Sequence, residues 1–173
     1  DPIAVQTGLE GDPVALFDIT IPINQDETKV KGLELMAQHT FGESGFGFQA
    51  NYTIVDGDLE YDINLNEEQW VVPGMSDTAN LVGFYDKGGF QIRLAYNWRD
   101  EYLQSPARDP RFVEEYSQLD LNASYEFSDN FSVFIEGINL TEEHQRIHGR
   151  SKYQVREYSV GHARYNLGAK YSF

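Results

Sequence analysis

The sequence contains no cysteine, few basic residues and no long apolar run. Without cysteine, neither a disulfide framework nor a thiolate metal site can form. The chain has 13 Lys and Arg residues and 28 Asp and Glu residues, which give a formal net charge of -15. A nucleic-acid partner would need a basic face, so we expect none. No stretch approaches the ~18 apolar residues of a membrane-spanning helix, and no signal-peptide pattern opens the chain at Asp1.

Aromatic residues are abundant, and they fall into an alternating pattern. The chain has 11 Tyr, 11 Phe and 2 Trp. In the closing segment YNLGAKYSF (165–173), every second residue is apolar or aromatic. The same period of two recurs in 33–41, 46–54, 90–98 and 119–127, and more weakly in 131–135. This period predicts antiparallel β-strands with one apolar and one polar face.

The connections between these segments alternate in length. The short ones are GESG (42–45), DKGG (86–89) and SDN (128–130), which have the composition of tight turns. The long polar ones span 56–74, 104–111 and 141–154. Short turns at one end and long loops at the other are typical of outer-membrane barrels. A soluble sandwich has no reason to place all its short turns at one end.

Aromatic residues also cluster at the predicted strand ends, as they do at the two interfaces of a bilayer. Those near the short turns are Phe41, Phe46, Tyr85, Phe90, Phe127, Phe131, Tyr171 and Phe173. Those toward the other end are Tyr52, Trp98, Tyr102 and Tyr116.

Two features carry a resemblance to a known family. The closing positions Tyr165, Leu167, Tyr171 and Phe173 resemble the C-terminal signature that the barrel assembly machinery recognises in outer-membrane barrels. The stretches NLVGFYDKGGFQIRLAYNWRDEYL and VFIEGINLTEE look like closing strands of TonB-dependent receptors. They are similar to a branch often associated with carbohydrate or other oligomeric nutrients.

The expected fold is an all-β, antiparallel transmembrane β-barrel. We count about seven strands in residues 29–173 and expect a bulge near GINL (137–140). The resemblance implies that these strands are the C-terminal portion of a barrel of about 22 strands with a plugged lumen. Residues 1–28 would then be the remnant of an extracellular loop or strand. The plug domain and the segment that contacts the TonB complex are not in this chain.

Two other architectures remain open from the sequence. The stretch ALFDITIPI (15–23) also alternates, and counting it as a strand gives about eight, enough for a self-contained small barrel that acts as an adhesin or a lipid-modifying enzyme. Pro22 argues against a central strand there. A soluble carbohydrate-binding β-sandwich is the second alternative.

The resemblance implies a part of an active transporter in the bacterial outer membrane, not an enzyme, and without a redox cofactor. Such a receptor captures a scarce small nutrient, either a carbohydrate or a siderophore-like ligand, and takes energy from TonB. Outer-membrane lipid would surround it. The polar residues expected to line the lumen are Gln49, Asn51, Gln91, Arg93, Asn97, Asp120, Asn122 and Glu126.

Candidate ligand contacts are the aromatic and cationic residues expected at the outer end. Aromatic faces stack on sugars, and arginine pairs with anionic or planar polar groups. The residues chosen on this basis are Tyr61, Trp70, Trp98, Arg99, Tyr102, Arg146 and Arg150. Each could instead be an interface aromatic or a solvated loop charge.

One acidic stretch has the spacing of a calcium loop. In DGDLEYDINLNE the candidate ligands are Asp56, Asp58, Glu60 and Asp62, followed by Asn64 and Glu67. However, Tyr61 occupies the position where such a loop needs glycine, and no helices are expected beside it. A solvated acidic loop is the simpler interpretation, and a Ca²⁺ ion in this extracellular loop is the alternative.

Overall fold

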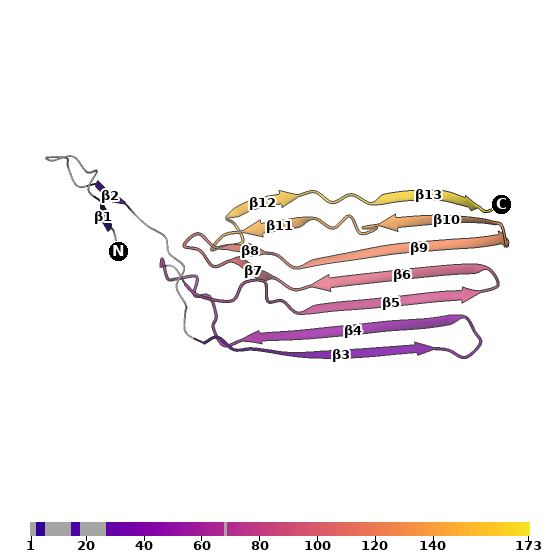
Figure 1. Cartoon of the computed structure of the whole chain (residues 1–173), viewed down its shortest axis with the longest axis horizontal. Coiled ribbons are helices and arrows are strands. Elements are labelled where there is room, and N and C mark those ends of the chain that lie inside the picture. The colour runs from indigo at the N-terminus through magenta and orange to yellow at the C-terminus, as the bar shows by residue number, and fades with distance from the viewer. Residues whose placement is uncertain (1–2, 6–14, 18–26, 68) are drawn as a thin grey trace.

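The computed structural model describes residues 3–5, 15–17, 27–67 and 69–173, and all regular structure within these ranges is β-strand (Figure 1). The largest unit, here called the wall sheet, has seven antiparallel strands in the order β13-β10-β9-β6-β5-β4-β3. They are β3 (Val30–Thr40), β4 (Phe46–Gly57), β5 (Thr78–Lys87), β6 (Phe90–Arg99), β9 (Tyr116–Ser128), β10 (Phe131–Ile138) and β13 (Arg164–Tyr171). The seven strands expected for residues 29–173 match the wall sheet in number, but the same residues also contain four short strands that were not expected.

Two smaller sheets account for the other strands. The loop sheet has the order β12-β11-β8-β7 and contains β7 (Tyr102–Ser105), β8 (Arg111–Val113), β11 (Gln145–His148) and β12 (Val155–Ser159). Near the N-terminus, β1 (Ile3–Val5) pairs with β2 (Ala15–Phe17). Within the described residues β2 pairs only with β1, and the rest of the 15–23 stretch lies outside them.

The register of the wall sheet separates apolar from polar side chains. One row across neighbouring strands runs through Ala50, Leu81, Tyr96 and Leu119, each paired with the next. The adjacent row contains Asn51, Asn80, Asn97 and Gln118. Because successive side chains of a strand point to opposite faces, these rows lie on opposite sides of the sheet. We call them the apolar face and the polar face.

All the short turns lie at one end of the wall sheet, beside the C-terminus, as Figure 1 shows. The β5–β6 turn consists of Gly88 and Gly89, with φ of 67° and 78°. Two successive residues in the left-handed region make the two-residue hairpin whose twist matches the strands, and glycine adopts it without strain. The predicted end-to-end asymmetry of turns and loops is therefore confirmed.

The β9–β10 pair is irregular at both of its ends. The register between β9 and β10 shifts at Phe131/Ser132, next to the turn, because Ser128 faces Phe131 while Glu126 faces Ser132. Residues 131–138 then pair without interruption to β13. The irregular residue at the other end is Asn139, whose φ of 56° ends the strand. Leu140 then donates to the Leu119 carbonyl at 2.8 Å, one residue out of the register in which Gly137 faces Leu121, so an irregularity lies within GINL, where the bulge was predicted.

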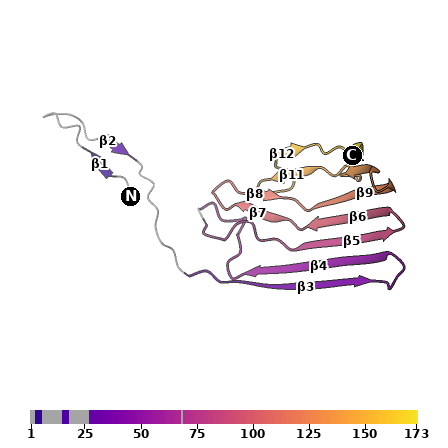
Figure 2. The same ribbon diagram turned by 45° about the vertical axis from the view of Figure 1, so that its right-hand side comes forward.

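The long connections are more ordered than a loop assignment suggests. Residues 100–115 fold back as the hairpin β7–β8, and residues 139–163 fold back as β11–β12. These hairpins join through β8 and β11 to form the loop sheet. Figure 2 shows the loop sheet continuing from the wall sheet at the end opposite the short turns.

A chain of aromatic contacts crosses the wall sheet beside the short turns. Ring centroids lie 4.6 Å apart for Phe46–Tyr85, 6.2 Å for Tyr85–Phe90 and 6.3 Å for Phe90–Tyr125. The contacts continue to Phe127 and Phe131. At the other end Tyr52 and Trp98 stack at 6.4 Å. Tyr116 does not belong to this second belt, because its hydroxyl donates to Gln118 on the polar face.

The apolar face is left exposed in this chain. Leu33, Leu81 and Leu167 expose 55%, 51% and 82% of their surface, far more than a water-soluble core would allow. The buried apolar side chains among the described residues are few: Val82, Val113 and Ile147. The sheet is open, with β3 and β13 at its edges. In the described part of the chain, no helix is long and apolar enough to cross a membrane.

Candidate functional site

The candidate site lies at the loop end, where the loop sheet meets the polar face of the wall sheet. Three connections contribute to it: residues 58–77 after β4, the β7–β8 hairpin after β6, and the β11–β12 hairpin after β10. Cross-connections between them decide whether they act as separate loops or as one layer.

Arg150 holds the first two connections together. One guanidinium nitrogen donates to the carbonyl oxygens of Ile63 and of Leu65, the latter at 2.6 Å. The other nitrogen donates to the carbonyl oxygen of Arg108 at 2.9 Å. The fork geometry of arginine allows one side chain to serve several acceptors. A residue from the β11–β12 hairpin thus joins the 58–77 segment to the β7–β8 hairpin.

Aromatic contacts reinforce the same junction. The Tyr61 hydroxyl donates to the Ala107 carbonyl at 3.3 Å, and its ring contacts Phe112 edge-on at 5.9 Å. Phe112 stacks on His148 with ring planes 15° apart. His148 exposes only 5% of its surface and contacts the Gly149 carbonyl through Nδ1 at 2.7 Å. The junction therefore has a small core of its own.

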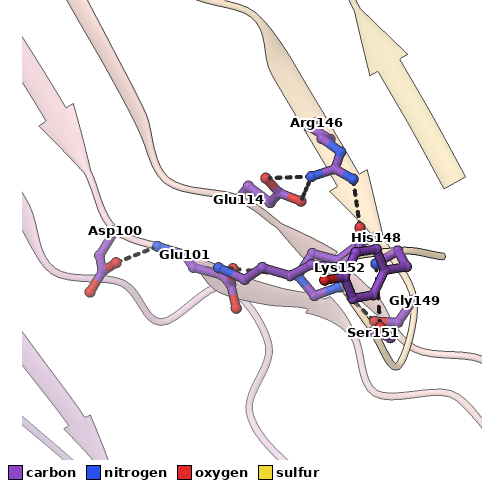
Figure 3. Close-up of polar contacts among 9 residues, drawn as sticks. Asp100, Glu101, Glu114, Arg146, His148, Gly149, Ser151 and Lys152 are labelled. Carbon is purple, nitrogen blue, oxygen red and sulfur yellow. Dashed lines mark hydrogen bonds and ion pairs between the residues drawn. The ribbon is translucent and has the colours of Figure 1, made fainter. Parts of the chain in front are cut away.

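Charged side chains surround that core, as Figure 3 shows. Arg146 lies 3.0 Å from the Glu114 carboxylate and donates to the Lys152 carbonyl at 2.5 Å. Lys152 pairs with Glu101 at 3.1 Å, and Glu101 also lies 3.4 Å from His148. The hydrogen bond and negative charge of Glu101 raise the pKa of Lys152. Each exposed pair is individually weak, but together they fix the β7–β8 hairpin against the β11–β12 hairpin.

A pocket of about 260 Å³, here called the Arg99 pocket, opens where this layer meets the wall sheet. It is lined by Arg99, Tyr116, Glu143, Gln145, Ser159, Val160 and Gly161. Arg99 and Tyr116 face each other on β6 and β9. The Arg99 guanidinium lies over the Tyr102 ring, 4.6 Å from its centroid, in a cation–π contact. Its Nε is buried and has no hydrogen-bond partner among the described residues.

Asn139 shapes the side of this pocket that carries Glu143. The Asn139 side chain accepts from the Glu143 amide at 2.9 Å and donates to the Glu143 carbonyl at 3.1 Å. The backbone amide of Asn139 in turn donates to Asp120 at 2.9 Å. Asn139 exposes only 6% of its surface. Its positive φ suits asparagine better than most residues, so one buried amide fixes the turn that presents Glu143.

The polar face below the pocket carries a network of side-chain hydrogen bonds. Gln118 donates to Asp120 at 2.8 Å, and Asn122 donates to Glu136 at 3.2 Å. The residues predicted to line the lumen all fall on this face by register: Gln49, Asn51, Gln91, Arg93, Asn97, Asp120, Asn122 and Glu126. A mainly polar surface, interrupted by Val82, Phe84 and Phe134, therefore leads away from the pocket toward the short-turn end.

The candidate ligand contacts fall into different environments. Arg99 and Tyr102 meet at the pocket, whereas Tyr61, Arg146 and Arg150 hold the loop layer together. Trp98 follows the apolar rows and donates to Glu115 at 2.6 Å, which is the environment of an interface aromatic. Trp70 is 53% exposed in the 69–77 segment. Ligand contact by these residues stays a prediction.

The acidic stretch after β4 is spread out. Asp56 is still within β4. Asp58 accepts from the Lys29 amide at 3.1 Å, and Asp62 caps the Asn64 amide at 2.8 Å. Within the described ranges, no group of three or more His, Asp or Glu side chains is positioned to hold a metal ion. The structure therefore does not gather Asp56, Asp58, Glu60 and Asp62 into a ligand set.

Sequence analysis missed several pocket residues. Glu143 and Gln145 lie in the long polar loop expected over 141–154, and Ser159 lies after it; only the β11–β12 pairing brings Gln145 opposite Ser159. Asn139 gave a weak signal, since an asparagine directly after a strand is typical of a left-handed turn position.

Long antiparallel strands with an apolar and a polar face, short turns at one end and a loop layer at the other define part of an outer-membrane-type β-barrel wall. The chain belongs to the TonB-dependent receptor family: the family model for a TonB dependent receptor-like β-barrel matches residues 1–140. Comparisons with curated proteins and with solved structures gave no match. Members of this family are outer-membrane receptors that transport ligands with the help of TonB.

Proposed function

We propose that this chain forms part of the wall and outer vestibule of a transporter that imports a scarce nutrient, either a carbohydrate or a siderophore-like ligand. The observation that carries the proposal is the position of the loop layer. It continues from the wall sheet at the end away from the short turns (Figure 1), and the Arg99 pocket opens where the two meet. A ligand captured there would meet the polar face on its way inward.

The polar face is suited to passage of a hydrophilic ligand. Amides, carboxylates and hydroxyls follow one another along it, so hydrogen bonds lost at one level can be replaced at the next. The apolar face would contact outer-membrane lipid. Energy would reach the ligand through a plug domain and the TonB complex.

Assembly into the membrane would depend on the last strand. Tyr165, Leu167, Tyr171 and Phe173 expose 68%, 82%, 64% and 111% of their surface. They follow the apolar rows of β13, and Phe173 contacts Tyr171 at 5.6 Å. An accessible aromatic C-terminus is what a contact with the barrel assembly machinery requires.

The transport proposal can be tested in cells. Parent, receptor-deletion and TonB-deletion strains are compared for uptake of nanomolar labelled oligosaccharides and ferric siderophores. We expect uptake of one ligand to fall to background in both deletion strains. Restoring the receptor gene should recover it only where TonB is present. Uptake that is unchanged by loss of the receptor across both classes of ligand would contradict the proposal.

A further inference from the structure

The Arg99 pocket combines hydrogen-bond donors and acceptors within a small volume. Arg99 supplies donors and Glu143 supplies acceptors, while Gln145 and Ser159 can do both. At about 260 Å³ the pocket is slightly smaller than a typical site for a drug-sized ligand. It therefore suits a single ring or a short polar group.

Two features show that the pocket is built to present unsatisfied groups. The buried Nε of Arg99 lacks a partner among the described residues, although the chain carries a large excess of carboxylates. A buried donor without an acceptor is costly, and because protein atoms enclose this Nε, a ligand oxygen in the pocket would bond to the other nitrogens of the Arg99 guanidinium. None of the ion pairs between described residues involves Arg99.

The side of the pocket that supplies hydrogen-bond acceptors, at Glu143, is also held in place. Asn139 clamps the backbone of Glu143 at both its amide and its carbonyl. Gly161 packs directly on this turn: a side chain there would collide with the Glu143 carbonyl oxygen and with Asn139, which lies 2.7 Å from the Cβ position. The Gly161 amide donates to His144 at 3.0 Å. The backbone of Glu143, which lines the pocket, is therefore held in a fixed turn.

We propose that the Arg99 pocket binds one neutral, hydroxyl-rich ring, a sugar unit of an oligosaccharide. A hydroxyl group can accept a hydrogen bond from Arg99 and donate one to Glu143. Neighbouring hydroxyls on a neutral ring therefore satisfy both residues without bringing a second negative charge near Glu143. An anionic group would gain Arg99 but would face Glu143 in the same pocket. A wholly apolar group would leave both charges unpaired. This inference rests on the proposed function, because it names the ligand class of that vestibule.

The test uses the intact receptor in detergent and a panel of immobilised ligands: neutral oligosaccharides, uronic-acid oligosaccharides, ferric siderophores and amino acids. We expect binding to at least one neutral oligosaccharide. Glu143→Gln should weaken it about tenfold to a hundredfold, because a charge-assisted hydrogen bond is lost. Glu142→Gln, at the exposed neighbouring position, is the matched control and should bind as the parent does.

The outcomes separate this inference from the transport proposal. Binding of only acidic, ferric or amino-acid ligands overturns the sugar assignment, and so does neutral-sugar binding that Glu143→Gln leaves unchanged. TonB-dependent uptake of a siderophore, with no neutral sugar bound, keeps the transport function and removes the pocket assignment. Conversely, neutral-sugar binding that Glu143→Gln weakens, together with uptake that does not depend on TonB, keeps the pocket assignment and removes the transport function.

Discussion

Replacing Arg150 with alanine should separate the loop layer while leaving the wall sheet intact. The side chain makes three hydrogen bonds to backbone carbonyls of two other connections. Such bonds contribute about 1 kcal/mol each when partly exposed, so about 3 kcal/mol should be lost. That corresponds to a rise on the order of 100-fold in the local opening equilibrium.

Amide hydrogen exchange followed by mass spectrometry of the intact receptor is the appropriate assay. Peptides covering 58–67 and 104–111 should exchange faster by about this factor, while peptides confined to strands β4, β5 and β6 should not change. Arg150→Lys should lie in between, because an ammonium cannot reproduce the planar fork. Arg108→Ala is the matched control: it removes a nearby arginine side chain but keeps the carbonyl that Arg150 contacts. Unchanged exchange of both loop peptides in Arg150→Ala would refute the proposed role of Arg150 in holding the two connections together.

Three further results are expected. Gly168→Ala should destabilise the receptor in urea unfolding by about 1–3 kcal/mol, because the new methyl group would overlap an aromatic ring on β10, whereas Gly83→Ala, where the space is open, should be nearly neutral. Leu94→Arg on the apolar face should lower the free energy of unfolding in vesicles by about 2–4 kcal/mol. Ala95→Arg, at the next position along β6 and on the polar face, should lower it much less. Finally, Glu101→Gln should lower the apparent pKa of Lys152 measured from acylation rates. Since Glu101 raises this pKa, the Glu101–Lys152 pair stabilises the loops at pH values below about 10.5, the pKa of lysine in the unfolded chain. The stabilisation is lost as the pH rises through the higher pKa of Lys152 in the folded chain.

The wall sheet could be predicted from the sequence because local rules and global fold agree there. Alternation along each strand sets which side chains share a face, and tight turns set which strands pair. Gly88 and Gly89, for example, specify both the β5–β6 hairpin and its register. The family match then supplied what no local rule contains, namely the kind of barrel to which such a wall belongs.

The loop layer could not be predicted in the same way, because its strands are short and pair across large sequence distances. Ile147 pairs with Val113, and no alternation over three or four residues identifies such a partner. The surroundings of Arg150 show the same difficulty. An arginine in a polar loop looks free in the sequence, yet here its donors are occupied by Leu65 and Arg108.

The contrast between these two parts also has a mechanical consequence. The wall strands are 8–13 residues long and continuously hydrogen-bonded. The loop layer depends on a small buried core around Val113, Ile147 and His148 and on exposed ion pairs of low individual strength. Burying two aliphatic side chains contributes only about 3–6 kcal/mol. The layer should therefore open as a unit well before the wall unfolds, which places reversible motion at the end where the pocket lies.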